Sequence, residues 1–210
     1  MATAQQEQHT PAVSDTRQVC IHFANLVVWR ASDHPRDQLT GIDMLLRFAR
    51  WAGIFDDGQL ASMRHRAEES PVEAQAALER AKVAREAIYR ILLAAANHER
   101  AAPEDVALLN DTVAEAQAQV HLAPTGEAGH LHWRWKSETP QFDMVLWAVA
   151  RSAAELLTSE ELTKVKSCPG EGCAYLFMDL SRNGKRRWCE MDVCGNRNKV
   201  KRFRQSHQGV

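Results

Sequence analysis

Residues 168–194 read CPGEGCAYLFMDLSRNGKRRWCEMDVC, and this stretch decides how the C-terminal part of the chain folds. It contains two close pairs of cysteines on either side of a loop: Cys168, Cys173, Cys189 and Cys194. Two such pairs are the usual layout of a tetrahedral zinc site, because each pair wraps one edge of the ion. Four thiolates leave no open position for water, so the spacing predicts one structural Zn²⁺.

The same four cysteines allow a second interpretation, in which they form two disulfides. Disulfides persist in oxidising compartments, but residues 1–18 contain no apolar segment of the kind that directs secretion. The chain also lacks an apolar run of the roughly 18 residues that a membrane helix needs. We therefore expect a cytoplasmic protein with reduced thiols and no membrane partner, in which Cys20 is a buried, unreactive thiol.

The residues between and after the cysteine pairs predict a small β-hairpin followed by a basic helix. Residues 175–180 favour a strand, Asn183-Gly184 is typical of a hairpin turn, and residues 186–188 would return as the second strand. A helix is expected over about 194–205, so that its first turn carries the last cysteine ligand. This order of knuckle, hairpin and helix is similar to a treble-clef zinc finger.

The rest of the chain predicts a mainly α-helical body. The apolar stretch 18–30 is compatible with either helix or strand. Periodicity and capping signals predict helices over about 41–53, 58–69 and 70–97, from 103, and from 139. Ser70-Pro71 with Glu73 is expected to form the capping box of the long helix. The inward-facing residues expected in the helix from 103 are Val106, Leu109, Val113 and Ala116.

Residues 120–135, VHLAPTGEAGHLHWRW, predict a small β-hairpin inside the body, because two alternating runs flank a segment that contains Pro and Gly. The expected fold class is therefore mainly α, with this hairpin and a C-terminal finger. The expected organisation is a disordered arm at 1–16, a helical regulatory domain at 17–163, a zinc finger at 164–206 and a tail at 207–210.

Charge divides the chain at the same place. Of its 210 residues, 26 are Lys or Arg and 27 are Asp or Glu. Residues 164–210 carry 11 of the basic and 4 of the acidic residues, a net charge of +7, which leaves −8 for residues 1–163. A short charge run is usually a solvated helix face, but interleaved Trp188 and Phe203 favour a nucleic-acid partner. The expected DNA contacts are Arg182, Lys185, Arg186, Arg187, Arg197, Lys199, Lys201, Arg202 and Arg204.

The tetrapeptide Cys194-Gly195-Asn196-Arg197, within SRNGKRRWCEMDVCGNRNKVKRFR (181–204), resembles the CGNR zinc finger, and all four cysteines match. The body resembles the ABATE domain that precedes this finger. Residues 21–26 correspond to its Leu-Asp-Phe-x-Asn-Thr stretch, with His22 and Leu26 in place of the Asp and the Thr. The resemblance covers residues 18–205 and implies a stress-induced bacterial transcription regulator with a DNA-binding finger.

These observations predict a zinc-dependent, DNA-binding transcription regulator whose body senses a small effector or mediates homodimerisation. The candidate effector-pocket residues are Asn25, Trp133, Arg134 and Arg151. The alternative is an RNA-binding or protein-interaction adaptor that uses the finger as a docking module. The sequence carries no nucleophile elbow, no phosphate-binding Gly-rich loop and no paired acid/base signature, so we do not expect an enzyme.

Overall fold

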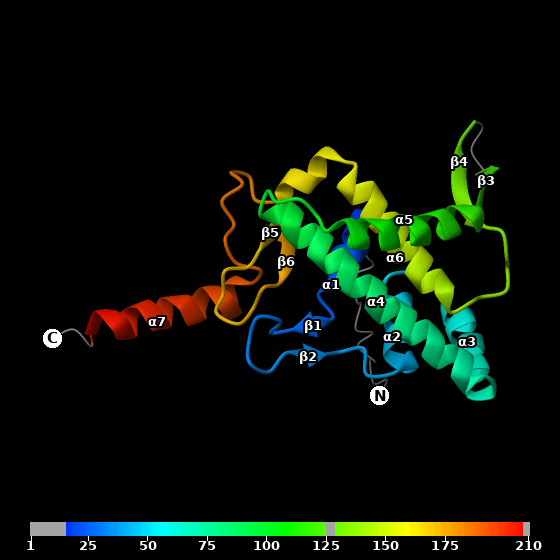
Figure 1. The fold of residues 1–210 in the computed structure, drawn as a ribbon, viewed down its shortest axis with the longest axis horizontal. Coiled ribbons are helices and arrows are strands. Elements are labelled where there is room, and N and C mark those ends of the chain that lie inside the picture. Colours follow the sequence, from blue (N-terminus) through cyan, green and yellow to red (C-terminus); the bar gives the residue numbers. More distant parts are fainter. Residues whose placement is uncertain (1–15, 125–128, 208–210) are drawn as a thin grey trace, which may run out of the picture.

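The computed structural model describes residues 16–124 and 129–207, and Figure 1 shows how its elements are arranged. The expected arm at 1–16 and tail at 207–210 lie outside the described residues, except for one residue each. Helices dominate the described part, as the sequence predicts, and its strands form three small antiparallel pairs. None of the helices in this part is long and apolar enough to cross a membrane.

The α-helices are Val19–Ala24 (α1), Ile42–Trp51 (α2), Asp57–Glu69 (α3), Pro71–Ala96 (α4), Pro103–Ala118 (α5), Asp143–Leu157 (α6) and Asn196–His207 (α7). The strand pairs are Val27–Val28 (β1) with Arg36–Asp37 (β2), Val120–Pro124 (β3) with Leu131–Trp135 (β4), and Val165–Ser167 (β5) with Leu176–Met178 (β6). Short helical turns lie at Thr16–Gln18 (η1), Glu160–Lys164 (η2) and Met191–Gly195 (η3), of which η3 is π-helical. The apolar stretch 18–30 thus contains both a helix and a short strand.

The long helix α4 is the central helix of the body, and α1, α5 and α6 pack against it (Figure 1). Its inward stripe is rich in alanine, so the neighbouring helices can approach closely. The largest fully buried side chains around it include Phe23, Leu78, Ile88, Leu92 and Leu156. The hairpin β3–β4 projects at one end of the body, and α7 extends away from the other end (Figure 1).

The start of α4 has the expected position but not the expected cap. A proline occupies its first turn, yet the Ser70 side chain makes no capping hydrogen bond. Ser70 also ends α3, where its N–H donates to the Arg66 carbonyl, and Glu73 pairs with the Arg66 guanidinium at 2.7 Å. The capping box lies instead at the start of α3, where the side chains of Asp56 and Gln59 each accept from the other's backbone N–H.

The buried face of α5 is turned slightly from the one that apolar periodicity predicts. Leu109 and Ala116 are buried as expected, but Val106 is 38% exposed. Asp105 is buried in its place, because its carboxylate accepts from the Arg90 guanidinium of α4 at 2.5 and 2.8 Å. An ion pair between two helices therefore outweighs the apolar pattern at this position.

The hairpin next to the cysteines is formed by other residues than the sequence predicts. Strand β6 pairs with β5, and residues 186–188 form no strand, so the expected pairing between 175–180 and 186–188 is wrong. The predicted turn exists, since the Gly184 N–H donates to the Ser181 carbonyl at 3.1 Å, but it leads into an irregular loop. The first cysteine pair therefore lies at the tip of the β5–β6 hairpin.

One face of the β5–β6 hairpin belongs to the core of the body. Val165, Leu176 and Met178 are at most 5% exposed and lie in the same apolar cluster as the buried residues of α1, α4 and α6. Phe177 points to the other face and packs with the cysteines. The hairpin thus joins the helical body directly to the cysteine cluster.

Candidate metal centre and nucleic-acid interface

The four cysteines of the C-terminal segment converge on one point. Their Sγ atoms all lie within 4.8 Å of one another. The Sγ atoms of Cys173 and Cys189 are 3.7 Å apart, and so are those of Cys189 and Cys194. A Zn–S bond of about 2.3 Å requires tetrahedral sulfurs about 3.8 Å apart. The cluster therefore has the dimensions of a four-thiolate zinc site.

The disulfide interpretation does not fit this geometry. A disulfide holds its sulfurs about 2.05 Å apart, whereas all five cysteines are free thiols. The fifth, Cys20, is fully buried in α1, and burial raises the pKa of its thiol to about 12. It is thus the buried thiol that its apolar neighbours predict, with little thiolate at neutral pH.

Backbone hydrogen bonds shape the first cysteine pair into a knuckle, residues 168–175. The Cys168 N–H donates to the Tyr175 carbonyl and the Cys173 N–H to the Gly170 carbonyl, both at 2.9 Å. A Cβ on Gly170 would lie 3.0 Å from the Cys194 Sγ, so a glycine is needed for the turn to approach the fourth sulfur. The knuckle is therefore built to surround the centre of the cluster closely.

The ionisation of these thiols shows why a cation suits the cluster. The hydrogen bond between Cys173 and Cys189 lowers the pKa of Cys173 to about 5 and raises the pKa of Cys189. Burial raises the pKa of Cys194 to about 12. Thiolates this close repel one another, and a divalent cation stabilises all four at once. Zinc held here would supply a structural cross-link, not a reactive water.

A single carboxylate, Asp179, holds the irregular loop that follows β6. It accepts hydrogen bonds from the backbone N–H groups of Ser181 and Arg186, each at 3.0 Å, and from the Lys166 ammonium at 2.5 Å. The Lys166 hydrogen bond is the main reason that the pKa of Asp179 lies well below its usual range. Side-chain bonds to Asp179 thus take the place of the strand pairing that the sequence predicts.

Three of the nine expected DNA contacts are exposed but contact other groups of the protein. Arg186 donates to the carbonyls of Trp188 and Cys189, and its guanidinium lies 4.7 Å from the centre of the Phe177 ring. Arg197 places its guanidinium 4.5 Å from the centre of the Trp29 ring. Lys201 binds the Glu171 carboxylate of the knuckle at 2.9 Å. These three side chains fix the shape of the segment and the position of α7.

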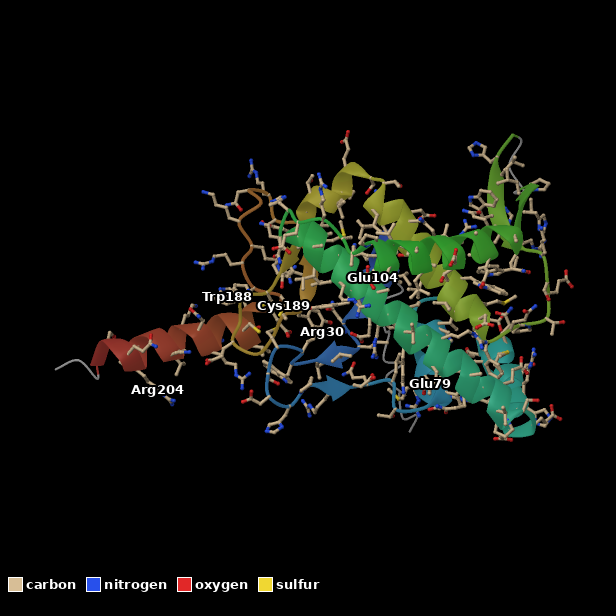
Figure 2. All side chains as sticks on the ribbon, in the orientation of Figure 1. Arg30, Glu79, Glu104, Trp188, Cys189 and Arg204 are labelled. Atoms are coloured by element: carbon tan, nitrogen blue, oxygen red, sulfur yellow. The ribbon has the colours of Figure 1, made fainter. Side chains whose placement is uncertain are left out.

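Five of the remaining basic side chains are exposed, on the loop around the cluster and on α7. Arg187 is exposed and lies 5.7 Å from the centre of the Trp188 ring. Arg182, Lys185, Lys199 and Arg204 are exposed as well, and none of these four forms an ion pair with the part of the chain that the structure describes. The side chain of Arg202 lies outside the description. Figure 2 shows Arg204 on the projecting part of α7, with Trp188 and Cys189 near the point where that helix begins.

The loop between Lys185 and Met191 forms an open cleft of about 670 Å³. It is lined by consecutive residues of the loop, namely Lys185, Arg186, Arg187, Trp188, Cys189, Glu190 and Met191. Lys185, Arg187 and Trp188 are side-chain types that bind phosphates and stack on bases. The Arg186 guanidinium is bound to backbone carbonyls, and Glu190 adds one negative charge. The cleft therefore has the chemistry of a nucleic-acid contact.

The four candidate effector residues do not form one pocket. Asn25 is buried, and its side-chain amide bonds to both the carbonyl and the N–H of Leu176 in β6, at 2.8 and 2.9 Å. Trp133 and Arg134 lie on β4, where the Arg151 guanidinium is 4.9 Å from the centre of the Trp133 ring. Asn25 thus fixes the junction with β6, whereas Trp133 and Arg134 belong to the projecting hairpin and Arg151 contacts it from α6.

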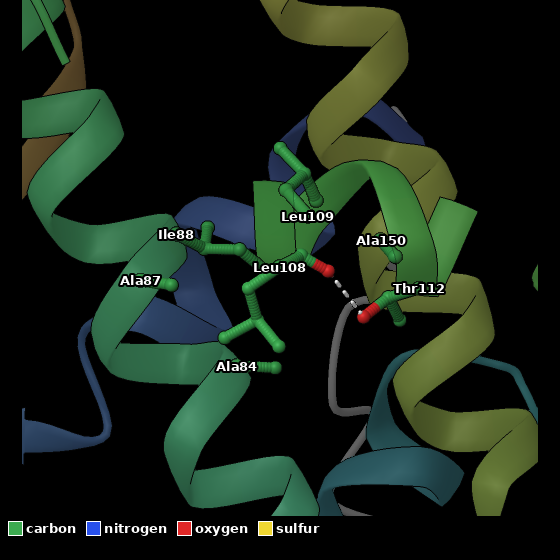
Figure 3. A pocket seen from close by; sticks show the side chains of 7 residues that line it. All are labelled: Ala84, Ala87, Ile88, Leu108, Leu109, Thr112 and Ala150. Atoms are coloured by element: carbon green, nitrogen blue, oxygen red, sulfur yellow. Dashed lines mark hydrogen bonds between the residues drawn. The ribbon is translucent and has the colours of Figure 1, made fainter. Parts of the chain in front are cut away.

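A small hollow lies between α4, α5 and α6 of the body (Figure 3). Its lining is apolar apart from Thr112, whose hydroxyl donates to the Leu108 carbonyl at 2.9 Å. The hollow has no room for a water molecule, so it is a packing defect too small for a metabolite.

Sequence reasoning missed the residues that join the body to the knuckle. The Tyr89 hydroxyl of α4 donates to the Ala174 carbonyl at 2.8 Å, and the Ala31 N–H donates to the Gly172 carbonyl at 3.2 Å. Trp29, with φ +56°, packs against the cysteine cluster beneath Arg197. These contacts join residues that are far apart in the chain, so no local sequence pattern predicts them.

The fold and the site define a helical protein with a C-terminal four-cysteine zinc finger. Residues 17–160 match the ABATE family, described as "Putative stress-induced transcription regulator", and residues 164–207 match the CGNR zinc finger. The chain therefore belongs to the ABATE family and carries a CGNR finger after the ABATE domain. No curated protein matches it. The two matches and the cysteine cluster support a zinc-binding regulator with one structural Zn²⁺.

Proposed function

We propose that this chain is a zinc-dependent transcription regulator that binds duplex DNA through its CGNR finger. The observation that carries the proposal is a set of exposed cations placed around the cysteine cluster and along α7: Arg182, Lys185, Arg187, Lys199 and Arg204. Lys and Arg side chains that neutralise DNA phosphates release counterions, which supplies affinity without reading sequence. The net charge of +7 in residues 164–210 supports the same partner.

The proposal divides the eight basic residues whose side chains the structure describes into two groups with different tasks. Arg182, Lys185, Arg187, Lys199 and Arg204 contact phosphates, whereas Arg186, Arg197 and Lys201 hold the finger in shape through Phe177, Trp29 and Glu171. Replacing an outward cation is therefore expected to weaken DNA binding without changing the fold. Replacing Arg186 is expected to weaken zinc retention as well, because its guanidinium binds the carbonyl of the ligand Cys189.

The salt dependence of duplex binding tests this assignment. Full-length, zinc-loaded protein would be titrated with a labelled random-sequence duplex at several salt concentrations. Removing one phosphate contact lowers the magnitude of the log–log salt slope by about 1, so Arg187→Ala and Lys199→Ala should each show this change. Arg64→Ala is the matched control, because Arg64 lies on α3 in the body and pairs with Asp43. Its salt slope should equal that of the wild type.

The outcomes separate DNA binding from the alternatives. Unchanged slopes in Arg187→Ala and Lys199→Ala would contradict the phosphate contacts. A protein that does not bind duplex DNA would favour the adaptor function instead, whether it binds single-stranded RNA or no nucleic acid at all.

The body is proposed to regulate the finger, by sensing a small effector or by mediating homodimerisation, and not to catalyse a reaction. The hairpin β3–β4 supports the homodimer, because Leu122, Leu131 and Trp133 are each more than 50% exposed on it. Exposed apolar side chains that cluster in this way are typical of interaction surfaces. Sedimentation of the wild type and of Trp133→Ser tests this part. A monomeric wild type would contradict dimerisation, and an effector would then be the remaining regulator.

A further inference from the structure

The outward face of α7 combines polar and apolar side chains. Asn196, Lys199, Val200 and Phe203 are spaced i, i+3, i+4 and i+7, so they share one side of the helix. Val200 is 49% and Phe203 is 63% exposed, although both are apolar. The protein therefore presents two adjacent apolar side chains to solvent on its most strongly basic element.

The opposite side of α7 is the one that faces the rest of the protein. Lys201 binds Glu171 of the knuckle, and Asn198 is the least exposed of the described side chains of this helix. Both lie about 150° around the helix from the centre of the outward face, at 100° per residue. Because Lys201 and Arg197 tie the first two turns to the knuckle and to Trp29, the outward face has a fixed direction.

The shape and charge of this helix indicate what covers the face. Its 12 residues extend about 18 Å, and a helix with its side chains is about 10–12 Å wide, which fits the DNA major groove. Lys199 lies in the face and Arg204 lies beside it, within a segment of net charge +7. A second copy of the same basic face would be repelled, whereas a polyanion is attracted.

We infer that α7 is a recognition helix for duplex DNA, and that Val200 and Phe203 read thymine methyl groups in the major groove. Apolar side chains recognise the C5-methyl group of thymine in the major groove. Asn196 is not assigned a base, because its side-chain amide donates to the Asp192 carbonyl at 3.3 Å. This inference rests on the proposed function and adds base-specific residues to phosphate contacts that carry no sequence information. It predicts a preferred site that contains thymine where these two side chains lie.

The test replaces thymidine by deoxyuridine, which removes the methyl group and keeps the base pair. A preferred duplex would first be selected from a random pool by full-length, zinc-loaded protein at a stated salt concentration. Each thymine of that duplex would then be replaced in turn, and the dissociation constant measured. Loss of one buried methyl corresponds to about a fourfold weaker complex, so the wild type should lose about fourfold at one or two positions.

The variants assign this loss to the two side chains. Val200→Ala and Phe203→Ala should each abolish the difference between thymidine and deoxyuridine at one position, with an unchanged salt slope. Lys199→Ala should weaken both duplexes equally. Val83→Ala is the matched control, because Val83 is 56% exposed on α4 in the body. This control should discriminate as the wild type does.

Several results would overturn the inference. These are a selected site without thymine, equal affinity for the two duplexes, or variants that retain the discrimination. A change in the sedimentation of DNA-free Val200→Ala or Phe203→Ala would identify the face as a protein interface. If the wild type binds no duplex at all, the proposed function fails first. Binding without methyl discrimination refutes only the inference about α7.

Discussion

Gly172 lies where the knuckle meets the loop between β1 and β2. Its φ is +71°, and a Cβ at this position would lie 2.9 Å from the Ser32 Cβ and 3.4 Å from the Ser32 Cα. Its carbonyl accepts from the Ala31 N–H. Both the left-handed backbone and the close approach of another chain segment therefore require glycine here.

Gly172→Ala is expected to lower the free energy of unfolding by about 2–4 kcal/mol, because backbone strain and overpacking add together. Gly184→Ala is the matched control, since Gly184 has φ +62° but a Cβ there would meet no atom within 4 Å. Strain alone should cost this control about 1–2 kcal/mol. Urea unfolding of the two zinc-loaded variants measures both values. Equal losses would show that the contact with Ser32 contributes nothing.

The sequence identifies the metal ligands and the basic residues, but it does not show which side chains they contact in the folded chain. Cysteine spacing identifies the four residues that converge, because a metal centre imposes that spacing. The sequence also marks the basic residues as a group, but Arg186 and Arg197 look the same as Arg182 in a charge count. Their engagement depends on Phe177 and Trp29, which reach them only through the folded chain.

At the scale of elements, most of the long helices and the hairpin at 120–135 form where their apolar patterns predict, whereas the hairpin next to the cysteines does not. Helix α4 covers almost the residues that its capping and periodicity signals predict. The pairing of β6 with β5 could not be predicted from the Asn-Gly turn, because Asp179 binds the backbone N–H of Arg186, at the start of the expected second strand. An Asn-Gly dipeptide thus indicates that the chain turns, but it does not show which strands pair with each other.

The contact between α4 and α5 predicts a pH dependence of stability. The Arg90 guanidinium holds the pKa of Asp105 below its usual value of 3.8. A carboxyl whose folded pKa is lowered contributes stability above the unfolded pKa, and loses it as pH falls through the folded value. Asp105→Asn should therefore be less stable than the wild type at pH 7, by about 1 kcal/mol because Arg90 is half exposed. The difference should shrink below about pH 4.

Urea midpoints of the wild type and of Asp105→Asn across pH measure this difference. Zinc loss in acid affects both proteins alike, so it cancels in the comparison. Asp57→Asn is the control, because its Arg50 pair is exposed on both sides and should change the midpoint less. A difference between wild type and Asp105→Asn that stays constant down to about pH 3 would contradict the role of the ionised carboxylate.

At the scale of the whole molecule, the finger and the body share a core. Val165, Leu176 and Met178 pack with the helices, while Asn25 and Tyr89 bond to the backbone of β6 and of the knuckle. The sequence places a boundary near residue 163 from charge and cysteine content, and this division stays a prediction about domains. Counts of charged residues and cysteines describe the surface and the metal site, but they do not show which apolar side chains of the two parts pack together.

Because of this shared core, zinc is expected to hold in place the DNA-binding surface as well as the cysteine cluster. The cluster holds the knuckle, the loop with Arg187 and the start of α7 in one place, through Cys168, Cys173, Cys189 and Cys194. A structural zinc site contributes on the order of 10–16 kcal/mol of apparent binding free energy that is coupled to folding. We therefore expect the DNA-binding surface to lose its geometry when zinc is removed.

Stepwise return of zinc to the chelated, reduced full-length protein tests the central claim most directly. The measurement is the fluorescence anisotropy of a labelled duplex at a fixed, stated salt concentration, recorded against zinc added per chain. Duplex binding should rise with zinc and reach its plateau at one zinc per chain, because the four thiolates form a single centre. Duplex binding that is equally strong without zinc, or a plateau at another stoichiometry, would contradict the account.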